Sequence, residues 1–122
     1  MILVDSSVWI DHFNKSDSHL IEILDQSEVS VHPMVIGELA LGGIRDRGTV
    51  LDLLDDLPPA ENASHPEVMA LIETRQLYGR GLSFVDAQLL ASAAISPETS
   101  LWTRDKRLRS AALEMGTAHQ FV

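Results

Sequence analysis

The sequence predicts an α/β fold built around a mainly parallel sheet. Short apolar runs at residues 2–4, 29–31 and 100–103 alternate with longer segments in which apolar residues recur every three or four positions. Strands that alternate with helices are typical of parallel sheets, because two parallel strands need a crossover connection between them. The length of 122 residues supports a substantial hydrophobic core but leaves no room for a second, so we expect one domain over residues 1–122.

The first elements follow from apolar runs and from helix-start and helix-stop residues. Ile2, Leu3 and Val4 form a run that ends at Asp5, which is typical of a buried parallel strand leading into a helix. Pro33 suits the first turn of a helix, and the glycines at 42 and 43 suit its end. In order, we expect a strand at 2–4, helices at 7–14 and from about 17, a strand at 29–31, and helices at 33–43 and 47–57.

The second half is predicted in the same way. Pro58, Pro59 and residues 61–64 indicate a turn or a short edge strand. Ser83 and Asp86 match a capping box, in which a serine and an acid three residues later satisfy backbone N–H groups at a helix start. We then expect a helix from 66 to about 78 closed by the glycines at 79 and 81, a helix at 83–95, a strand at 100–103, a helix at 105–115 and a candidate final strand at 118–122.

Charge and composition exclude several classes of protein. Nine Lys and Arg residues against 18 Asp and Glu give a formal net charge of -9. Such a protein is a poor passive binder of nucleic acid, because non-specific affinity for phosphate comes from surplus Lys and Arg. An acidic protein that handles nucleic acid must therefore recruit cations. The absence of cysteine excludes disulfides and zinc-thiolate sites, and the five histidines show no metal-ligand spacing, so we expect them at the surface or in turns.

No segment of the sequence indicates a membrane or an export signal. The apolar run at 2–4 is far shorter than the apolar stretch of about 7–15 residues in a signal peptide. No segment approaches the roughly 20 apolar residues of a membrane span. We expect a cytoplasmic protein that does not bind membranes.

Four acidic residues stand where ligands bind in α/β proteins, outside the carboxyl ends of the strands. Asp5 follows the first predicted strand, Asp105 follows the strand at 100–103, and Asp86 lies in the first turn of its helix. Glu38 is expected on an apolar helix face, where a lone carboxylate is costly unless it is paired, protonated or bound to a metal.

Each acid also has a plain structural alternative. Asp5 and Asp105 could cap helices, Asp86 could be the acid of the capping box, and Glu38 could be partly exposed or paired with an arginine. Four carboxylates that converge without a basic partner repel one another, and a hard divalent cation with oxygen ligands resolves that repulsion. We therefore interpret the four as a candidate magnesium site of a hydrolase, where a metal-bound hydroxide attacks a phosphodiester.

Four segments in register carry a resemblance to a known family. The sequence resembles the PIN-domain ribonucleases, and more narrowly the VapC-like toxins of prokaryotic toxin-antitoxin pairs. The matching segments are Val-Asp-Ser-Ser-Val-Trp-Ile at 4–10, Gly-Glu-Leu-Ala-Leu-Gly at 37–42, Leu-Ser-Phe-Val-Asp-Ala at 82–87 with the apolar residues at 89–91, and Trp-Thr-Arg-Asp at 102–105.

The resemblance implies a three-layer α/β/α sandwich with a mainly parallel sheet of four to five short strands. It also implies a metal-dependent endoribonuclease in which Asp5, Glu38, Asp86 and Asp105 hold one or two magnesium or manganese ions. Asp5 and Asp86 would be the primary ligands. Glu38 would orient metal-bound water or share in ligation, and Asp105 would complete a second metal position or act through water.

The resemblance further implies supporting residues and partners. The hydroxyls of Ser7 and Thr103 would hold the carboxylates in place. The chain would form a homodimer, cleave structured RNA, and be inhibited by a small cognate antitoxin inserted in the active-site groove.

A basic run lies directly beside Asp105. Arg104, Lys106, Arg107 and Arg109 are four of the nine positive charges. They could form a solvated cationic helix face, but cations are unfavourable at a helix N-terminus. This misplacement favours a role in binding RNA phosphates near the metal site.

Two other functions remain open from the residues alone. One is a response-regulator receiver, which also gathers acids around magnesium and would use Asp55 or Asp56 as phosphoacceptor; the leucines around this pair look helical, and serines stand at 6 and 7 where acids would be expected. The other is a catalytically inactive PIN-like binding module, which the presence of all four acids disfavours.

Overall fold

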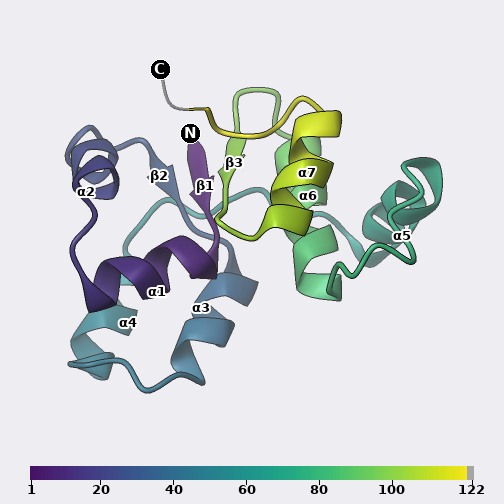
Figure 1. Ribbon diagram of the computed structural model, residues 1–122. Helices are drawn as coiled ribbons and strands as arrows, with labels where there is room; N and C mark the ends of the chain where they lie inside the picture. Colours follow the sequence, from purple (N-terminus) through teal and green to yellow (C-terminus); the bar gives the residue numbers. More distant parts are fainter. Residues whose placement is uncertain (121–122) are drawn as a thin grey trace.

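The computed structural model describes residues 1–120 and contains a small parallel sheet surrounded by helices (Figure 1). The strands have the order β2-β1-β3, so β1 lies in the centre, and both of its pairings are parallel. In chain order the elements are β1 (Ile2–Val4), α1 (Ser6–Asn14), α2 (Ser18–Asp25), β2 (Val29–Ser30), α3 (Pro33–Ala40), α4 (Arg47–Asp55), α5 (His65–Thr74), α6 (Phe84–Ala94), β3 (Ser100–Trp102) and α7 (Lys106–Glu114).

The register of the sheet aligns the carboxyl ends of its strands. Ile2 of β1 pairs with Val29 of β2, and Val4 at the end of β1 pairs with Trp102 at the end of β3. The chain leaves β1 towards β2 on one side, and β3 lies on the other. The strand order therefore changes direction between β1 and β3, and such switch points are where open α/β sheets bind ligands.

The helices form two groups around the sheet (Figure 1). The helices α1 to α4 gather on the β2 side, whereas α6 and α7 cover β3 and α5 lies outermost against α6. This arrangement agrees with the α/β/α sandwich that the sequence predicts. Within residues 1–120, no helix has the length and apolar character needed to cross a membrane.

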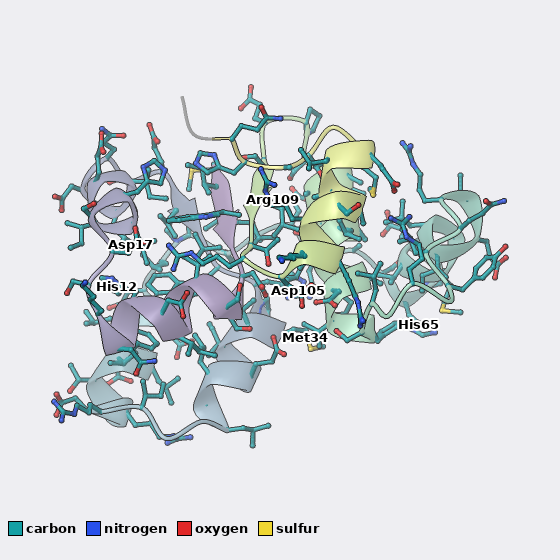
Figure 2. The ribbon with its side chains drawn as sticks, viewed as in Figure 1. His12, Asp17, Met34, His65, Asp105 and Arg109 are labelled. Carbon is teal, nitrogen blue, oxygen red and sulfur yellow. The ribbon has the colours of Figure 1, made fainter. Side chains whose placement is uncertain are left out.

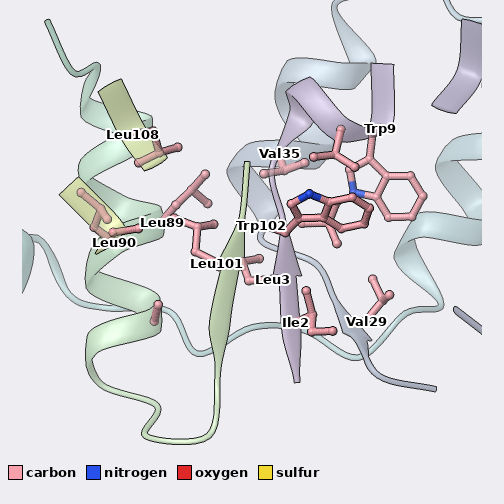
Figure 3. Close-up of a cluster of buried hydrophobic side chains, with 14 of the residues drawn as sticks. Ile2, Leu3, Trp9, Val29, Val35, Leu89, Leu90, Leu101, Trp102 and Leu108 are labelled. Carbon is pink, nitrogen blue, oxygen red and sulfur yellow. The ribbon is translucent and has the colours of Figure 1, made fainter. Parts of the chain in front are cut away.

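The core lies where the helices meet β1 and β3 (Figure 3). Leu89 and Leu90 of α6 and Leu108 of α7 pack with Leu101 of β3, and all four are almost completely buried. On the other side the indole of Trp102 joins the core with residues of α1 and α3. Burial of each large apolar side chain contributes about 1.5–3 kcal/mol, so the core fixes α6 and α7 relative to the sheet.

The number of strands is smaller than predicted. Three strands are present among residues 1–120, not four to five. The segments expected as an edge strand near 58–64 and a final strand at 118–122 each form only an isolated bridge, Val31 with Pro59 and Leu101 with Ala118. Proline cannot donate to a strand ladder, which limits the first of these to one pairing; residues 121–122 lie outside the described part.

Helix ends agree with the predictions within about two residues, with two exceptions. The helix expected over 33–43 ends at Ala40, three residues early. The helix expected over 66–78 starts at His65 and stops at Thr74. Gln76 adopts a left-handed backbone with a φ of 53°, and the Leu77 N–H donates to the Ile72 carbonyl. This turn ends the helix before the glycines that were expected to close it.

Candidate functional site

Asp5 is the buried centre of the site. It directly follows the central strand β1 and is 5% exposed. Two hydroxyls donate to its Oδ2, Ser7 Oγ at 2.8 Å and Thr103 Oγ1 at 2.7 Å. Asp5 occupies the N-cap position of α1, yet its side chain accepts no capping hydrogen bond. The alternative role as a helix cap is therefore wrong for Asp5.

The hydrogen bonds of Ser7 and Thr103 fix the direction in which each hydroxyl donates its proton. Thr103 Oγ1 accepts the backbone N–H of Asp105 at 3.0 Å, and Ser7 Oγ accepts the backbone N–H of Arg104 at 3.0 Å. Because a hydroxyl has only one proton, these accepted bonds leave each proton for Asp5. The network joins the start of α1 to the loop after β3 and holds the Asp5 carboxylate in one orientation.

Glu38 lies on α3 and reaches the site through Ser6. Ser6 Oγ donates to Glu38 Oε1 at 3.3 Å and lies 3.5 Å from Asp5 Oδ1, so it bridges the two acids. Burial raises the pKa of Glu38, and the negative charges of Asp5 and Asp86 raise it further, against the opposing hydrogen bond from Ser6. The residue as a whole is exposed, although its carboxylate is partly withdrawn from water.

The expected apolar environment of Glu38 is wrong in one respect. Of its expected apolar neighbours, Val35 is buried in the core, whereas Met34 is 43% and Leu41 is 92% exposed. Helical spacing places these residues on one side of α3, but it does not say which of them the core covers. Glu38 therefore stands where the buried and the exposed apolar residues of α3 meet.

Asp86 serves the helix and the site at once. It completes the predicted capping box, because the Ser83 N–H donates to Asp86 Oδ2 at 2.9 Å and Ser83 Oγ accepts the Asp86 N–H at 3.1 Å. Burial raises the pKa of Asp86 more than the two Ser83 bonds lower it, and the charges of Asp5 and Asp105 raise it as well. The capping role uses one carboxylate oxygen and leaves the other.

Asp105 also caps a helix while facing the site. Its Oδ1 accepts the backbone N–H groups of Arg107 at 2.9 Å and Leu108 at 3.1 Å, which starts α7. Figure 2 shows Asp105 at this end of α7, close to where α1 begins. Its second oxygen takes no part in the cap, so the capping role is confirmed and the metal-binding role of Asp105 stays a prediction.

The four carboxylates lie in one another's electrostatic field without a compensating cation from the described chain. The ion pairs of residues 1–120 use Asp11, Asp17 and Glu114 instead. Oxygen donors with unbalanced negative charge fit a hard divalent cation. Within residues 1–120, no three acidic or histidine side chains lie together closely enough to hold a metal ion by themselves. Magnesium itself is typically bound through one or two carboxylates and several waters.

Comparison with known proteins shows the family of the chain. Residues 2–114 match the family model of the PIN domain. The chain belongs to the PIN domain family. Ribonuclease VapC32 of Mycobacterium tuberculosis, from strains CDC 1551 / Oshkosh and H37Rv, is 52% identical over 118 residues, which cover 97% of this chain and 95% of the relative. The resemblance to VapC-like proteins noted from the sequence is thus confirmed.

Two solved structures share the fold of this PIN domain. The crystal structure of PAE2754 from Pyrobaculum aerophilum has a TM-score of 0.58 and 19% identity, and the match covers 94% of this chain and 96% of that chain. The structure of FitAB bound to an IR36 DNA fragment has a TM-score of 0.58 and 15% identity, and the match covers 100% and 99%. These similarities concern the fold alone, and they agree with the predicted α/β/α class.

The sequence interpretation of this PIN domain missed Ser6. Ser7 was expected to support the carboxylates and does so, whereas Ser6 was assigned no role. Ser6 lies one residue after Asp5, at the first position of α1, where its side chain points towards α3. The serine pair after Asp5 was the available signal, but only the packing of α1 against α3 shows which acid each hydroxyl meets.

Arg104 is held away from the four acids. Its guanidinium pairs with Asp11 at 2.9 Å and with Asp17, and it lies 5.5 Å from the ring centroid of Trp102. Burial raises the pKa of Asp17, but the bonds from the Leu20 N–H and from Arg104 outweigh it, so this pKa is lowered. This geometry favours a structural role for Arg104 over the expected RNA contact.

One smaller expectation is corrected, and one alternative function loses its basis. His32 is not a surface residue: it is 1% exposed and its Nδ1 accepts the Met34 N–H at the start of α3. Asp55 ends α4 and Asp56 caps it, both exposed, so neither follows a strand as a phosphoacceptor must. The position of this pair removes the basis for a receiver domain.

A groove adjoins Glu38 on the surface of the PIN domain. A cavity of about 510 Å³ opens between α1 and the segment after α3. Glu38 forms one wall, and the rest combines apolar side chains such as Phe13 with polar ones such as Asn14 and Arg45. Its lining residues are Ile10, Phe13, Asn14, Glu38, Leu39, Gly42, Gly43, Ile44 and Arg45.

Proposed function

We propose that this PIN domain is the ribonuclease toxin of a toxin-antitoxin pair and cleaves RNA with magnesium or manganese. The observation that carries the proposal is Asp5, a buried carboxylate that two hydroxyls hold in place and that shares its field with Glu38 and Asp86. The relative Ribonuclease VapC32, at 52% identity over nearly the full chain, supports the same class of activity.

The residues of the site have different proposed roles. Asp5 and Asp86 would hold the ion, and the oxygens of Asp105 and Glu38 that remain outside hydrogen bonds would complete its surroundings directly or through water. When bound, one or two divalent ions supply an activated water and neutralise charge on the phosphodiester. Ser7 and Thr103 keep Asp5 from rotating away from this position. Orientation of ligands by surrounding hydrogen bonds typically matters about 10–100-fold in affinity or activity.

Glu38 is suited to orient water or accept its proton. Its pKa is raised, first by burial and then by the charge of Asp5, so the carboxylate is more basic than an ordinary glutamate. A base works best when its pKa approaches the working pH. Ser6 Oγ, which donates to Glu38, would fix the direction of the carboxylate.

The groove beside Glu38 is the proposed binding site of the antitoxin. Apolar and polar side chains line it together, and Ile10 in the groove and Leu41 near it are exposed. An amphipathic segment that covers these side chains would also reach Glu38 and block access to the acids. We further propose that the toxin acts in the cytoplasm as a homodimer, which size-exclusion chromatography with light scattering would test.

A growth and cleavage experiment tests the function. Induced expression of the chain should arrest bacterial growth, and expression of Asp5→Ala or Asp86→Ala should not. RNA from the arrested cells should show defined new ends where the toxin has cut. Growth arrest by Asp5→Ala equal to that of the unchanged protein would contradict the proposal, and folded protein that cuts no RNA with either metal would favour an inactive binding module.

A further inference from the structure

A small basic hollow lies between α7 and the segment before α6. It has a volume of about 250 Å³ and is lined by Arg80, Lys106, Arg107 and Ser110. Three of the nine Lys and Arg residues of this acidic chain therefore line one hollow. On α7, positions 106, 107 and 110 share one face by helical spacing, and Arg109 is not among the lining residues.

Two cations of the hollow stand at a helix end where positive charge is unfavourable. Lys106 and Arg107 are the first two residues of α7, where the helix dipole disfavours positive charge. Among residues 1–120, neither forms an ion pair. Arg80 pairs with Glu114 at 2.8 Å, but Arg80 is only half-buried and Glu114 is exposed, and pairs in contact with water are weak. The hollow thus holds positive charge that is available to an anion.

Gly81 gives Arg107 its position. The backbone at Gly81 has a φ of 77°, and a Cβ there would lie 2.5 Å from Arg107 Nη1 and 3.0 Å from Arg107 Cδ. Only glycine lets the guanidinium lie flat against this turn without strain. Gly79 has a similar φ of 72°, but a Cβ added there would meet no atom within 4 Å, so it faces open space.

The walls of the hollow are continuous with the acidic site. Arg107 N donates to Asp105 Oδ1, and its side chain reaches Gly81. Two residues after Gly81, Ser83 N donates to Asp86 Oδ2. One wall therefore carries Asp105 and the other leads to Asp86. A polyanionic chain whose scissile phosphate lies at these acids would pass close to Arg107.

We propose that this hollow binds a backbone phosphate of the RNA next to the phosphodiester that is cleaved. The inference rests on the proposed ribonuclease function and adds Arg80, Gly81 and Ser110 to the residues that serve it. The fork of N–H donors in arginine matches a phosphate group, and the Ser110 hydroxyl adds a further donor. The charge of the hollow attracts RNA locally, which the net charge of -9 does not.

Binding of a labelled single-stranded RNA in EDTA tests the hollow without chemistry. Arg107→Gln and Lys106→Gln should each weaken binding, by on the order of tenfold, and each should reduce the slope of log affinity against log salt by about 0.7. Glu114→Gln removes a competing negative charge and should strengthen binding. Lys15→Gln, which makes the same charge change at the end of α1, should leave it unchanged, and Arg109→Gln should weaken it less than Arg107→Gln.

A charge-neutral pair of variants separates geometry from charge. Gly81→Ala and Gly79→Ala impose similar strain at a positive φ, but only the first displaces Arg107. We expect Gly81→Ala to weaken RNA binding relative to Gly79→Ala at equal thermal stability. Equal affinities for the two alanine variants, together with an Arg107→Gln protein that binds like Lys15→Gln, would overturn the inference.

Two further outcomes keep the inference distinct from the proposed function. Wild-type protein that cuts RNA with magnesium or manganese while Arg107→Gln binds and cuts normally would overturn the hollow and leave the ribonuclease function intact. Wild-type protein that cuts no RNA would refute the function itself.

If Arg107→Gln loses affinity for poly-glutamate but keeps its affinity for RNA, the hollow binds carboxylates of a protein partner, and the inference is wrong.

Discussion

The hydroxyl of Thr103 and the carboxylate of Asp5 lie 2.7 Å apart although 98 positions separate them in the chain. Thr103 follows β3 and Asp5 follows β1, and the two strands are neighbours in the sheet. The parallel register brings both carboxyl ends to the same edge. Here the topology of three short strands places a buried acid and its supporting hydroxyl together.

Loss of the Thr103 hydroxyl should impair the site. Thr103→Val removes a donor to Asp5 and an acceptor for the Asp105 N–H. We expect RNA cleavage to fall about 10–100-fold and the free energy of unfolding to fall by about 1–3 kcal/mol. Thr103→Ser keeps the hydroxyl and should restore most activity, and Thr117→Val is the matched control. Wild-type cleavage by Thr103→Val would show that this bond does not position Asp5.

Ser6 should act through Glu38. The Ser6 bond lowers the pKa of Glu38 against the raising effects of burial and of Asp5, so Ser6→Ala should raise this pKa further. If ionised Glu38 is needed, the acid limb of the profile of kcat/KM against pH moves to higher pH. Ser18→Ala at the exposed start of α2 should leave the profile in place. If the acid limb of the Ser6→Ala profile stays at the wild-type pH, the ionisation of Glu38 does not control the reaction.

Magnesium should offset the loss of folding stability that Glu38 and Asp86 cause as the pH rises. Burial and neighbouring charge raise the pKa values of Glu38 and Asp86 in the folded protein. The folded protein therefore binds protons more tightly than the unfolded chain, and this stabilisation is largest below the ordinary pKa values of about 4. The stabilisation is lost as the pH rises through the raised pKa values of the folded protein. Denaturant unfolding in EDTA should show this decline. Magnesium at a hundred times its dissociation constant should add about 2.7 kcal/mol at neutral pH.

Glu38→Gln provides the control for this linkage. It should raise the stability of the metal-free protein at neutral pH by no more than about 1 kcal/mol, because solvent still screens a carboxylate that is only partly withdrawn from water. It should also reduce the gain from magnesium. Glu73→Gln makes the same change on the exposed face of α5 and should do neither. A magnesium gain that is equal in all three proteins would place the ion elsewhere.

Arg104 should stabilise the fold without binding RNA. Arg104→Met removes its pairs with Asp11 and Asp17 and its contact with Trp102, so the free energy of unfolding should fall by about 1–3 kcal/mol. The pKa of Asp17 is lowered in part by Arg104, so the stabilisation should disappear as the pH falls below about 4. RNA affinity should stay within about twofold of the unchanged protein, and a tenfold loss would return Arg104 to the RNA interface.

Much of the site was predictable because its acids stand at element junctions. Asp5 and Asp105 follow strands and Asp86 starts a helix, so local sequence signals place all three. The surroundings of Glu38 were only partly predictable, because α3 buries Val35 in the core but leaves Met34 exposed, and helical spacing does not show which apolar residues the core covers. The direction of Arg104 depends on α2, whose contact with the loop after β3 leaves no local signal.

The fold class and the order of the elements were predicted correctly, whereas the number of strands was not. The three strands of the sheet coincide with apolar runs, whereas the two expected extra strands are single bridges whose formation depends on neighbouring backbone. The early end of α5 at Thr74 comes from the left-handed turn at Gln76, a conformation that glutamine does not signal. Helix starts were predicted best because capping residues mark them, as at Ser83.

Cleavage of RNA by purified protein with and without metal tests the central claim most directly. The unchanged protein and Asp55→Asn should both cut RNA with magnesium or manganese and stop in EDTA. Asp5→Asn should remain folded by circular dichroism and cut nothing under the same conditions. Cleavage by Asp5→Asn at the wild-type rate, or wild-type cleavage that persists in EDTA, would contradict the assignment of these carboxylates as a metal-dependent nuclease site.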